Sequence, residues 1–386
     1  MILLSWKKKA LMPVILFWTV CICGGDFMHG IYAVPVNETD IAREKELGFT
    51  YMHCYLNPYT EKGHDAAQKQ LDLAEKYGVK VAFDVFTRVL VGKKDAVAEL
   101  IRIVRDFKNH PALGAWYLYD EPFTEQQRRD LHLFYSVLKR ETPDIPVLLC
   151  LAQNEQWKNF IEPCDVLMGD LYPIKDEPFP EAPVHYFTNY LREMSKYNKP
   201  FIAIPQLMCW TSYPNVVKGF DNSRLRYPNE TEMRCFFYAP LATGNMNGVF
   251  WYSYYDLFYK ERKNGTRNSD FIKMAIPLLR EFREFTSLLK DPAHPQVFRW
   301  AEGNQFQLAL FDGIDGKQYI VLVNLWPVKR RFDRWAERLV SENVNLKPWR
   351  FTRNVPAKVE NGKFILAGDW IYPWETMIWE VEKVAK

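Results

Sequence analysis

Short apolar runs alternate with amphipathic stretches between residues 30 and 290. The apolar runs predict strands at 30–34, 49–56, 79–86, 113–119, 147–151, 165–171, 201–207 and 248–254. The stretches between them have apolar residues at helical spacing and predict helices at 41–47, 66–77, 95–107, 125–140, 157–161, 186–197, 232–241 and 271–289. Eight such units predict an α/β fold, a closed (β/α)8 barrel. An open, doubly wound sheet is the alternative, but no glycine-rich turn follows the first strand to support it.

The pattern changes after Pro292. Short alternating runs, separated by Gly-Asn, Asp-Gly and Asn-Gly turns, lie at 297–300, 306–311, 319–324, 363–366 and 376–381. Alternation with such turns is typical of antiparallel strands. The chain therefore divides, as a prediction, into a leader at 1–25, a barrel at 26–291 and a small β-sandwich-like domain at 292–386.

The first 25 residues have the pattern of an export signal. A run of three lysines, Lys7 to Lys9, precedes about fourteen mostly apolar residues that end at Cys23. That run is short for a membrane span, which needs roughly 20 residues. The leader is either a signal peptide or a lipoprotein leader that ends at Cys21 or Cys23. We expect an exported protein, periplasmic, on the cell surface or extracellular, whose only membrane contact is a possible N-terminal lipid anchor.

Charge and composition indicate which classes of partner the protein is expected to bind. The chain has 50 basic and 47 acidic side chains, and removing the three leader lysines leaves 47 of each. A neutral body does not attract phosphate backbones, so nucleic acid is not an expected partner. Aromatic residues make up 16% of the chain, and aromatic faces suit sugar rings. No CxxC or HxH pair is present, so neither a metal nor another cofactor is expected.

Polar and aromatic side chains gather where the predicted strands end, and in a barrel that is where active sites are built. The candidates are His53, Asp84, Asp120, Glu121, Asp170, Tyr172, Gln206, Trp251 and Tyr254. Trp210 and Tyr252 are further aromatic residues that either belong to the core or contact a sugar. This set of acids, amides and aromatics suits glycosidic cleavage, because a carboxylic acid protonates the leaving oxygen while other groups stabilise the positive anomeric carbon.

The run from Leu113 to Pro122, LGAWYLYDEP, resembles the fourth strand of (β/α)8-barrel glycoside hydrolases of the clan-A type. GDLYP at 169–173 and GVFWY at 248–252 are similar to the same group. The resemblance covers roughly residues 27–290 and implies that Glu121 is the general acid/base. Two positions depart from the pattern: Asp120 stands where an Asn is usual, and Gln206 stands where a Glu nucleophile is usual. A neutral amide cannot form the covalent glycosyl-enzyme, so the two-Glu retaining mechanism is not expected.

Three interpretations remain open. In hexosaminidase-type barrels, which also carry an adjacent Asp-Glu pair, the Glu is the acid/base and the Asp orients the substrate's 2-acetamido group, which attacks the anomeric carbon. Asp120, Glu121 and Tyr172 match those roles, provided that the strand bends before Pro122. The second is an inverting enzyme with Asp170 or Asp84 as base. The third is a barrel without catalysis, which either binds carbohydrate without cleaving it or serves as the scaffold of a surface or interaction protein. In the first two, Asp84, Asp170, Tyr172, Gln206, Tyr254 and His53 contact the sugar and Trp251 forms the floor of the innermost subsite.

Overall fold

The computed structural model describes residues 27–152, 157–175, 190, 193, 196–197, 199–216, 218–219, 225–260, 269–301, 306–326, 328–332, 338–340, 344–366 and 370–383. The predicted leader at 1–25 and most of the predicted helix at 186–197 lie outside these residues.

Eight parallel strands form a closed barrel in the order in which they occur along the chain. The strands are β1 (Met28–Tyr32), β2 (Tyr51–His53), β3 (Lys80–Asp84), β4 (Leu113–Asp120), β5 (Val147–Leu151), β6 (Val166–Leu171), β7 (Phe201–Pro205) and β8 (Met246–Trp251). The barrel closes where Gly30 of β1 pairs with Phe250 of β8. This arrangement confirms the predicted barrel and excludes the open sheet.

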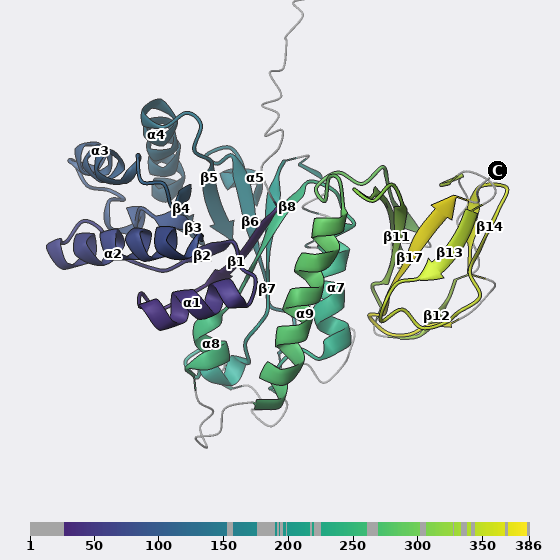
Figure 1. Ribbon diagram of the computed structural model, residues 1–386. Helices are drawn as coiled ribbons and strands as arrows, with labels where there is room; N and C mark the ends of the chain where they lie inside the picture. Colours follow the sequence, from purple (N-terminus) through teal and green to yellow (C-terminus); the bar gives the residue numbers. More distant parts are fainter. Residues whose placement is uncertain are drawn as a thin grey trace, which may run out of the picture.

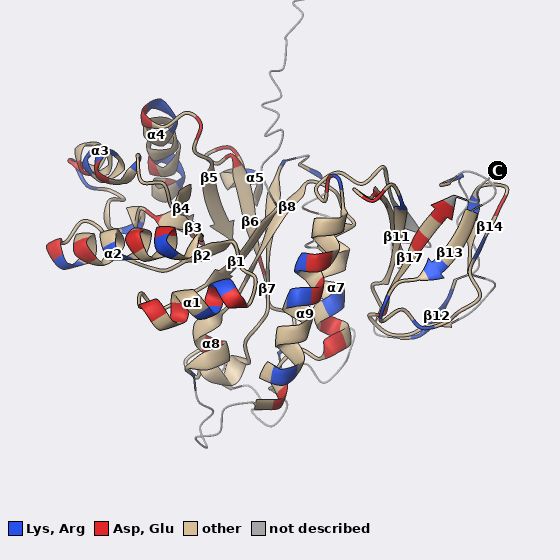
Figure 2. Ribbon diagram, in the orientation of Figure 1, with Lys and Arg blue, Asp and Glu red and all other residues tan. Residues whose placement is uncertain are grey.

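Helices surround the barrel and carry charged residues on their outer faces (Figures 1 and 2). The helices and short 3-10 turns are α1 (Glu38–Glu46), α2 (Glu61–Tyr77), η1 (Thr87–Val89), α3 (Ala96–Phe107), α4 (Glu125–Glu141), α5 (Trp157–Phe160), η3 (Trp210–Ser212), α7 (Glu230–Leu241), α8 (Tyr254–Phe258) and α9 (Ser269–Leu288). Local sequence sets their ends. Thr124 and Gln127 form a capping box that starts α4, and Gly78 adopts the left-handed conformation that ends α2. Within the described part of the chain, no helix is both apolar enough and long enough to cross a membrane.

Side chains of each barrel strand alternate between the barrel interior and the layer under the helices. The interior is filled by Tyr32, Ala82, Ala115, Tyr117, Leu148, Cys150, Val166, Met168, Ile202, Ile204 and Phe250. Their neighbours in sequence, such as Trp116 and Leu118 on β4, pack outward in the larger core under the helices. Whether a side chain can reach the mouth of the barrel therefore depends on which of the two faces of its strand it lies on.

The C-terminal region is an antiparallel sheet in the order β13-β17-β11-β10-β9, with two further two-stranded pairs, β12-β16 and β14-β15. The strands are β9 (Val297–Ala301), β10 (Phe306–Asp312), β11 (Gln318–Asn324), β12 (Arg330–Arg331), β13 (Val344–Pro348), β14 (Lys358–Glu360), β15 (Lys363–Ile365), β16 (Trp370–Ile371) and β17 (Thr376–Lys383). This confirms the predicted antiparallel β domain. The boundary predicted at residue 292 stays a prediction.

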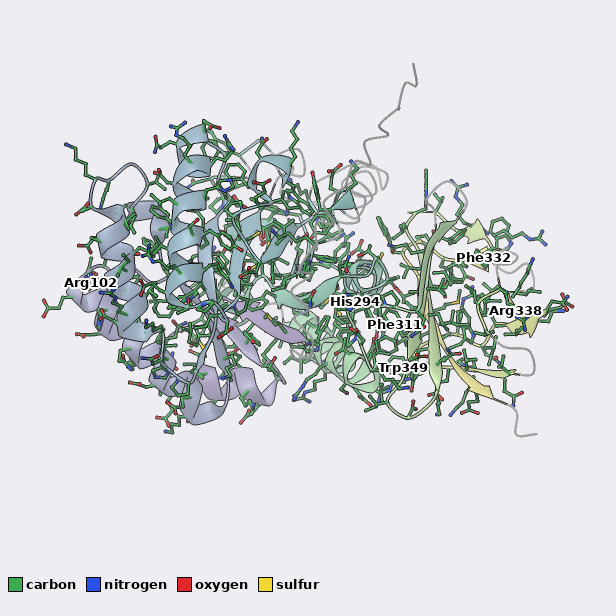
Figure 3. All side chains as sticks on the ribbon, turned by 90° about the horizontal axis from the view of Figure 1, so that it is seen from above. Arg102, His294, Phe311, Phe332, Arg338 and Trp349 are labelled. Carbon is green, nitrogen blue, oxygen red and sulfur yellow. The ribbon has the colours of Figure 1, made fainter. Side chains whose placement is uncertain are left out.

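The C-terminal sheet packs on the barrel through α7 and α9 (Figure 1). Phe311 and Trp349 lie on the side of the sheet that faces the barrel, and Phe332 lies on the opposite side (Figure 3). The first two belong to the same buried core as the barrel helices, where Phe285 of α9 packs against the Trp349 ring. Phe332 belongs to a separate core inside the C-terminal region. A continuous apolar contact therefore holds the sheet against the barrel wall.

Candidate active site at the barrel mouth

A cavity of about 220 Å³ opens where the barrel strands end. Residues from β1, β4 and β6 and from the segments after β2, β4, β6, β7 and β8 line it: Tyr32, Tyr55, Asp120, Glu121, Asp170, Tyr172, Met208, Trp210, Tyr213 and Tyr252. Three carboxyl groups thus share one small cavity with six aromatic rings, five of them tyrosines. In barrels of this type the carboxyl ends of the strands are the face on which ligands bind.

The end of β4 turns both of its carboxyl groups into this cavity. Regular alternation would send Asp120 and Glu121 to opposite faces. The register between β4 and β5 shifts between Tyr117 and Asp120, and Glu121 has φ +53°, in the left-handed region. The backbone N–H of Glu121 donates to the carbonyl of Cys150 at 3.1 Å, which holds this unusual conformation. The bend that the acetamide interpretation required before Pro122 is therefore present.

Hydrogen bonds and a nearby guanidinium fix the direction of the Asp120 carboxyl. The Tyr117 hydroxyl, which points into the barrel interior, donates to Oδ1 of Asp120 at 2.7 Å. Arg88 lies with Nη2 3.9 Å from Oδ2 of Asp120 and also 3.9 Å from Oδ2 of Asp84. A quarter of the Asp120 side chain stays accessible to solvent. Tyr117 in the barrel interior and Arg88 in η1 therefore hold the Asp120 carboxyl, and part of that carboxyl stays open to a ligand.

Asp84 lies beside the cavity and does not line it. It is 4% exposed, and its Oδ1 accepts a hydrogen bond from the backbone N–H of Phe86 at 2.7 Å. Burial raises the pKa of the Asp84 carboxyl to about 8, against smaller lowering effects from the Phe86 N–H and Arg88. Its Oδ2 lies 3.9 Å from Nη2 of Arg88, beneath the Arg88–Asp120 contact.

Asp170 faces the cavity from β6 and contacts Glu121. It is 6% exposed, and Cys150 Sγ donates to its Oδ1 at 3.3 Å. Burial is the largest cause that raises the pKa of the Asp170 carboxyl well above its usual range. A hydrogen bond with Glu121 and repulsion from Glu121 and Asp120 raise the pKa further. The two carboxyls are thus in hydrogen-bond contact, closer together than the roughly 6.5–9.5 Å that separates the acid and base of an inverting enzyme.

Aromatic side chains form much of the rest of the cavity lining. Tyr172 packs against Tyr252 at a ring-centroid distance of 5.3 Å and against Trp210 at 6.2 Å. The Tyr213 hydroxyl donates to Oδ2 of the buried Asp256 at 2.7 Å and lies 3.3 Å from the Tyr252 hydroxyl oxygen. These contacts hold rings and hydroxyls in fixed directions, which suits a ligand with apolar faces and hydroxyl edges.

The sequence predicts that Gln206 contacts substrate, but its side-chain amide is hydrogen-bonded to the backbone instead. Its side chain is fully buried. Its Oε1 accepts from the N–H of Ile174 at 2.9 Å, and its Nε2 donates to the carbonyls of Ile174 and Met208 at 3.0 and 3.1 Å. The amide therefore ties the segment after β6 to the segment after β7, and it is absent from the cavity lining. This position corrects the expectation that Gln206 contacts the sugar.

Three other predicted residues lie away from the cavity. Trp251 is on the outer face of β8, where it stacks on Phe282 of α9 at 5.5 Å, so it is not the floor of a subsite. Tyr254 is buried in α8 and donates to Oδ1 of Asp40 in α1 at 2.8 Å. His53 is buried below the cavity: its Nδ1 lies 3.0 Å from the carbonyl oxygen of Ala82, and burial lowers its pKa to about 3. None of the three lines the cavity.

Comparison with known proteins reveals similarity in structure only. No family model and no curated protein sequence matches the chain. The structure is similar to a glycoside hydrolase family 5 protein from Bacteroides vulgatus, with a TM-score of 0.62 and 12% identity over 93% of this chain and 90% of that one. It is also similar to trehalose-6-phosphate hydrolase from Bacillus licheniformis, with a TM-score of 0.57 and 9% identity over 93% and 99% of the two chains. The chain shares the barrel fold of glycoside hydrolases. At these identities the likeness establishes the fold and not the reaction.

The sequence left Trp210 and Tyr252 open between the core and the sugar, and the structure places both at the cavity. Four further lining residues were not selected from the sequence: Tyr32, Tyr55, Met208 and Tyr213. Alternation along the strand could have found Tyr55, because its side chain lies on the same face as that of His53. Met208 and Tyr213 follow β7 in a segment without regular alternation, and no local signal directs them to the barrel mouth.

Proposed function

We propose that this protein hydrolyses glycosidic bonds, with Glu121 as the general acid/base. The observation that carries the proposal is the bend at the end of β4, which brings Asp120 and Glu121 into one aromatic cavity at the carboxyl ends of the strands. A non-glycine residue in the left-handed region is uncommon, and such conformations concentrate at functional sites. The structural likeness to glycoside hydrolases agrees with this reading.

The reaction that best fits this cavity uses the substrate's own 2-acetamido group. Glu121 donates a proton to the leaving oxygen as the glycosidic C1–O bond breaks and the acetamide oxygen bonds to C1. Asp120, whose direction Tyr117 and Arg88 fix, accepts a hydrogen bond from the acetamide N–H, and Tyr172 contacts the same group. Water then attacks C1, its proton passes to Glu121, and the acetamide oxygen leaves. No protein nucleophile is needed, which agrees with the engagement of Gln206 in backbone hydrogen bonds.

The inverting alternative receives less support from this geometry. Asp170 contacts Glu121 directly, and Asp84 lies outside the cavity lining. Asp170 is closer to Glu121 than the roughly 6.5–9.5 Å that admits a water molecule, and Asp84 does not reach the cavity that a sugar would occupy.

A panel of aryl glycosides with and without a 2-acetamido group tests the proposal. We expect turnover of the acetamido substrates, with the first-formed sugar retaining its anomeric configuration by proton NMR. Glu121→Gln should reduce kcat by at least about 10²-fold, the lower end of acid/base contributions, with unchanged thermal stability. Glu61→Gln, at an exposed position in the first turn of α2, is the matched control. Wild-type rates in Glu121→Gln on every cleaved substrate would remove Glu121 from the mechanism.

A second candidate is a barrel that binds carbohydrate without cleaving it. Gln206 favours it, because a bound amide stands where related barrels carry a nucleophile. It predicts that sugars bind, by calorimetry or chemical-shift change, while no reducing ends are released from any glycan offered.

Export is part of the proposal. It depends on the lysine run and apolar run at 1–25, and carbohydrate is the expected partner outside the cell. Mass spectrometry of the N-terminus after expression in the native host would reveal cleavage or lipidation near Cys21 or Cys23. An intact, unmodified Met1 in a cytoplasmic fraction would contradict export.

A further inference from the structure

The contact between Glu121 and Asp170 joins residues that are 49 positions apart in the sequence. The two carboxyl groups are hydrogen-bonded to each other at the cavity surface. An ionised carboxylate can only accept hydrogen bonds, so a bond between two carboxyl groups requires a proton on one of them. A hydrogen bond between these two cavity-lining carboxyls therefore places one proton on the pair, whichever oxygen carries it.

Cys150 of β5 holds both members of the pair. Strand β5 lies between β4 and β6 in the barrel. The carbonyl of Cys150 accepts from the N–H of Glu121 at 3.1 Å, and its thiol donates to Oδ1 of Asp170 at 3.3 Å. Burial raises the pKa of this thiol well above its usual range, so it remains a donor. One buried residue thus sets the position of the Glu121 backbone and of one Asp170 oxygen.

We propose that Glu121 and Asp170 act as a proton-sharing pair, in which Asp170 retains the catalytic proton and Glu121 delivers it to the leaving oxygen. This inference rests on the proposed function. As the C1–O bond breaks, the shared proton moves through Glu121 to the leaving oxygen, and the acetamide oxygen bonds to C1. Both carboxyls are then negative beside the positive sugar ring. When water bonds to C1 and the acetamide oxygen leaves, the proton of the water returns to the pair.

A proton-sharing pair explains how the catalytic acid can hold a proton at neutral pH. An isolated carboxylic acid in contact with solvent is mostly ionised at neutral pH and has no proton to give. Two carboxyls in contact keep one proton to higher pH, because its removal places two negative charges side by side. The titratable groups that face Asp170 are Glu121 and Asp120 from β4, Cys150 from β5, Tyr172 after β6, Tyr32 from β1, Tyr55 after β2 and Tyr252 after β8.

Asp170→Asn tests the role of Asp170. The amide can still donate a hydrogen bond to Glu121 but cannot release a proton. We expect the alkaline limb of the kcat/KM profile to move by at least about one pH unit toward acid, and kcat at neutral pH to fall at least about tenfold, with KM within about threefold. Asp165→Asn, just before the opposite end of β6, is the control. There the carboxylate accepts from Tyr135 and Lys139, so its loss lowers stability without moving the limb. A raised KM with an unmoved limb would make Asp170 a substrate-binding residue and overturn the pair.

A measurement without substrate keeps the inference independent of turnover. Infrared difference spectra of wild type minus Asp170→Asn at neutral pH should contain the C=O stretch of a protonated carboxylic acid. Asp84, whose pKa of about 8 also favours its protonated form, contributes to both spectra and cancels. A spectrum without this band refutes the shared proton. If the band is present but no glycoside is cleaved, the proton pair stands and the proposed hydrolysis fails.

Discussion

The hydrogen bond from Tyr117 to Asp120 offers a sharp test of how the site is built. Tyr117→Phe removes one hydroxyl from a fully buried ring and leaves the packing of the barrel interior almost unchanged. That hydroxyl donates to Oδ1 of Asp120 at 2.7 Å and lies 3.3 Å from the hydroxyl oxygen of Tyr32. Without it, the polar contact that remains for the Asp120 side chain among the described residues is the more distant Arg88, and the carboxyl can rotate away from the acetamide.

A hydrogen bond to a charged group contributes about 1.5–3 kcal/mol. If the bound acetamide depends on this orientation, kcat/KM on 2-acetamido glycosides should fall roughly 10- to 150-fold, since about 1.4 kcal/mol corresponds to a factor of ten. Michaelis–Menten kinetics on an aryl 2-acetamido glycoside, paired with urea unfolding of the same preparation, provides the measurement. We expect the free energy of unfolding to change by less than the loss in transition-state binding.

Tyr135→Phe is the matched control for this change. Tyr135 donates to Oδ1 of Asp165 at 2.8 Å, so the same type of hydrogen bond is lost just before the start of β6, at the opposite end of the barrel from the cavity. It should lower stability without changing kcat/KM. If Tyr117→Phe stays within about threefold of wild type while its ring remains buried, the orientation of Asp120 does not depend on this bond, and the reasoning is refuted.

Two further predictions concern buried polar groups. Asp84 has a raised pKa of about 8 in the folded protein, whereas an unfolded Asp titrates near 3.9, so folding takes up a proton and stability falls between about pH 4 and 8 by up to about 1.4 kcal/mol per pH unit. Asp84→Asn, which can still accept from Phe86 N–H, should gain stability relative to wild type across that window in urea unfolding; parallel pH curves would contradict this. Gln206→Glu should lower the melting temperature and should not create a nucleophile, because the Nε2 donors to Ile174 and Met208 become acceptors facing carbonyls. A variant of wild-type stability with a new covalent glycosyl adduct, detected by mass spectrometry, would disprove it.

Much of the fold could be read from local patterns. The predicted strand at 113–119 and helix at 125–140 coincide closely with β4 and α4, because alternation, helical spacing and the capping residue Thr124 lie within a few residues of each other. The C-terminal sheet was harder to assign in detail: β13 at Val344–Pro348 was not expected, because this strand has few apolar residues and is half-buried or exposed along its length.

The sequence by itself determined that eight strand–helix units form a barrel and that an Asp-Glu pair ends the fourth strand, since both facts are encoded by neighbouring residues. Only the tertiary structure decided which strand-end side chains meet. At the end of β8 a difference of one residue sends Trp251 outward to α9 and Tyr252 into the cavity, because successive side chains point to opposite faces. The contact of Glu121 with Asp170 likewise depends on a left-handed backbone and on strand neighbours that are distant in sequence, and these arise only when the barrel closes.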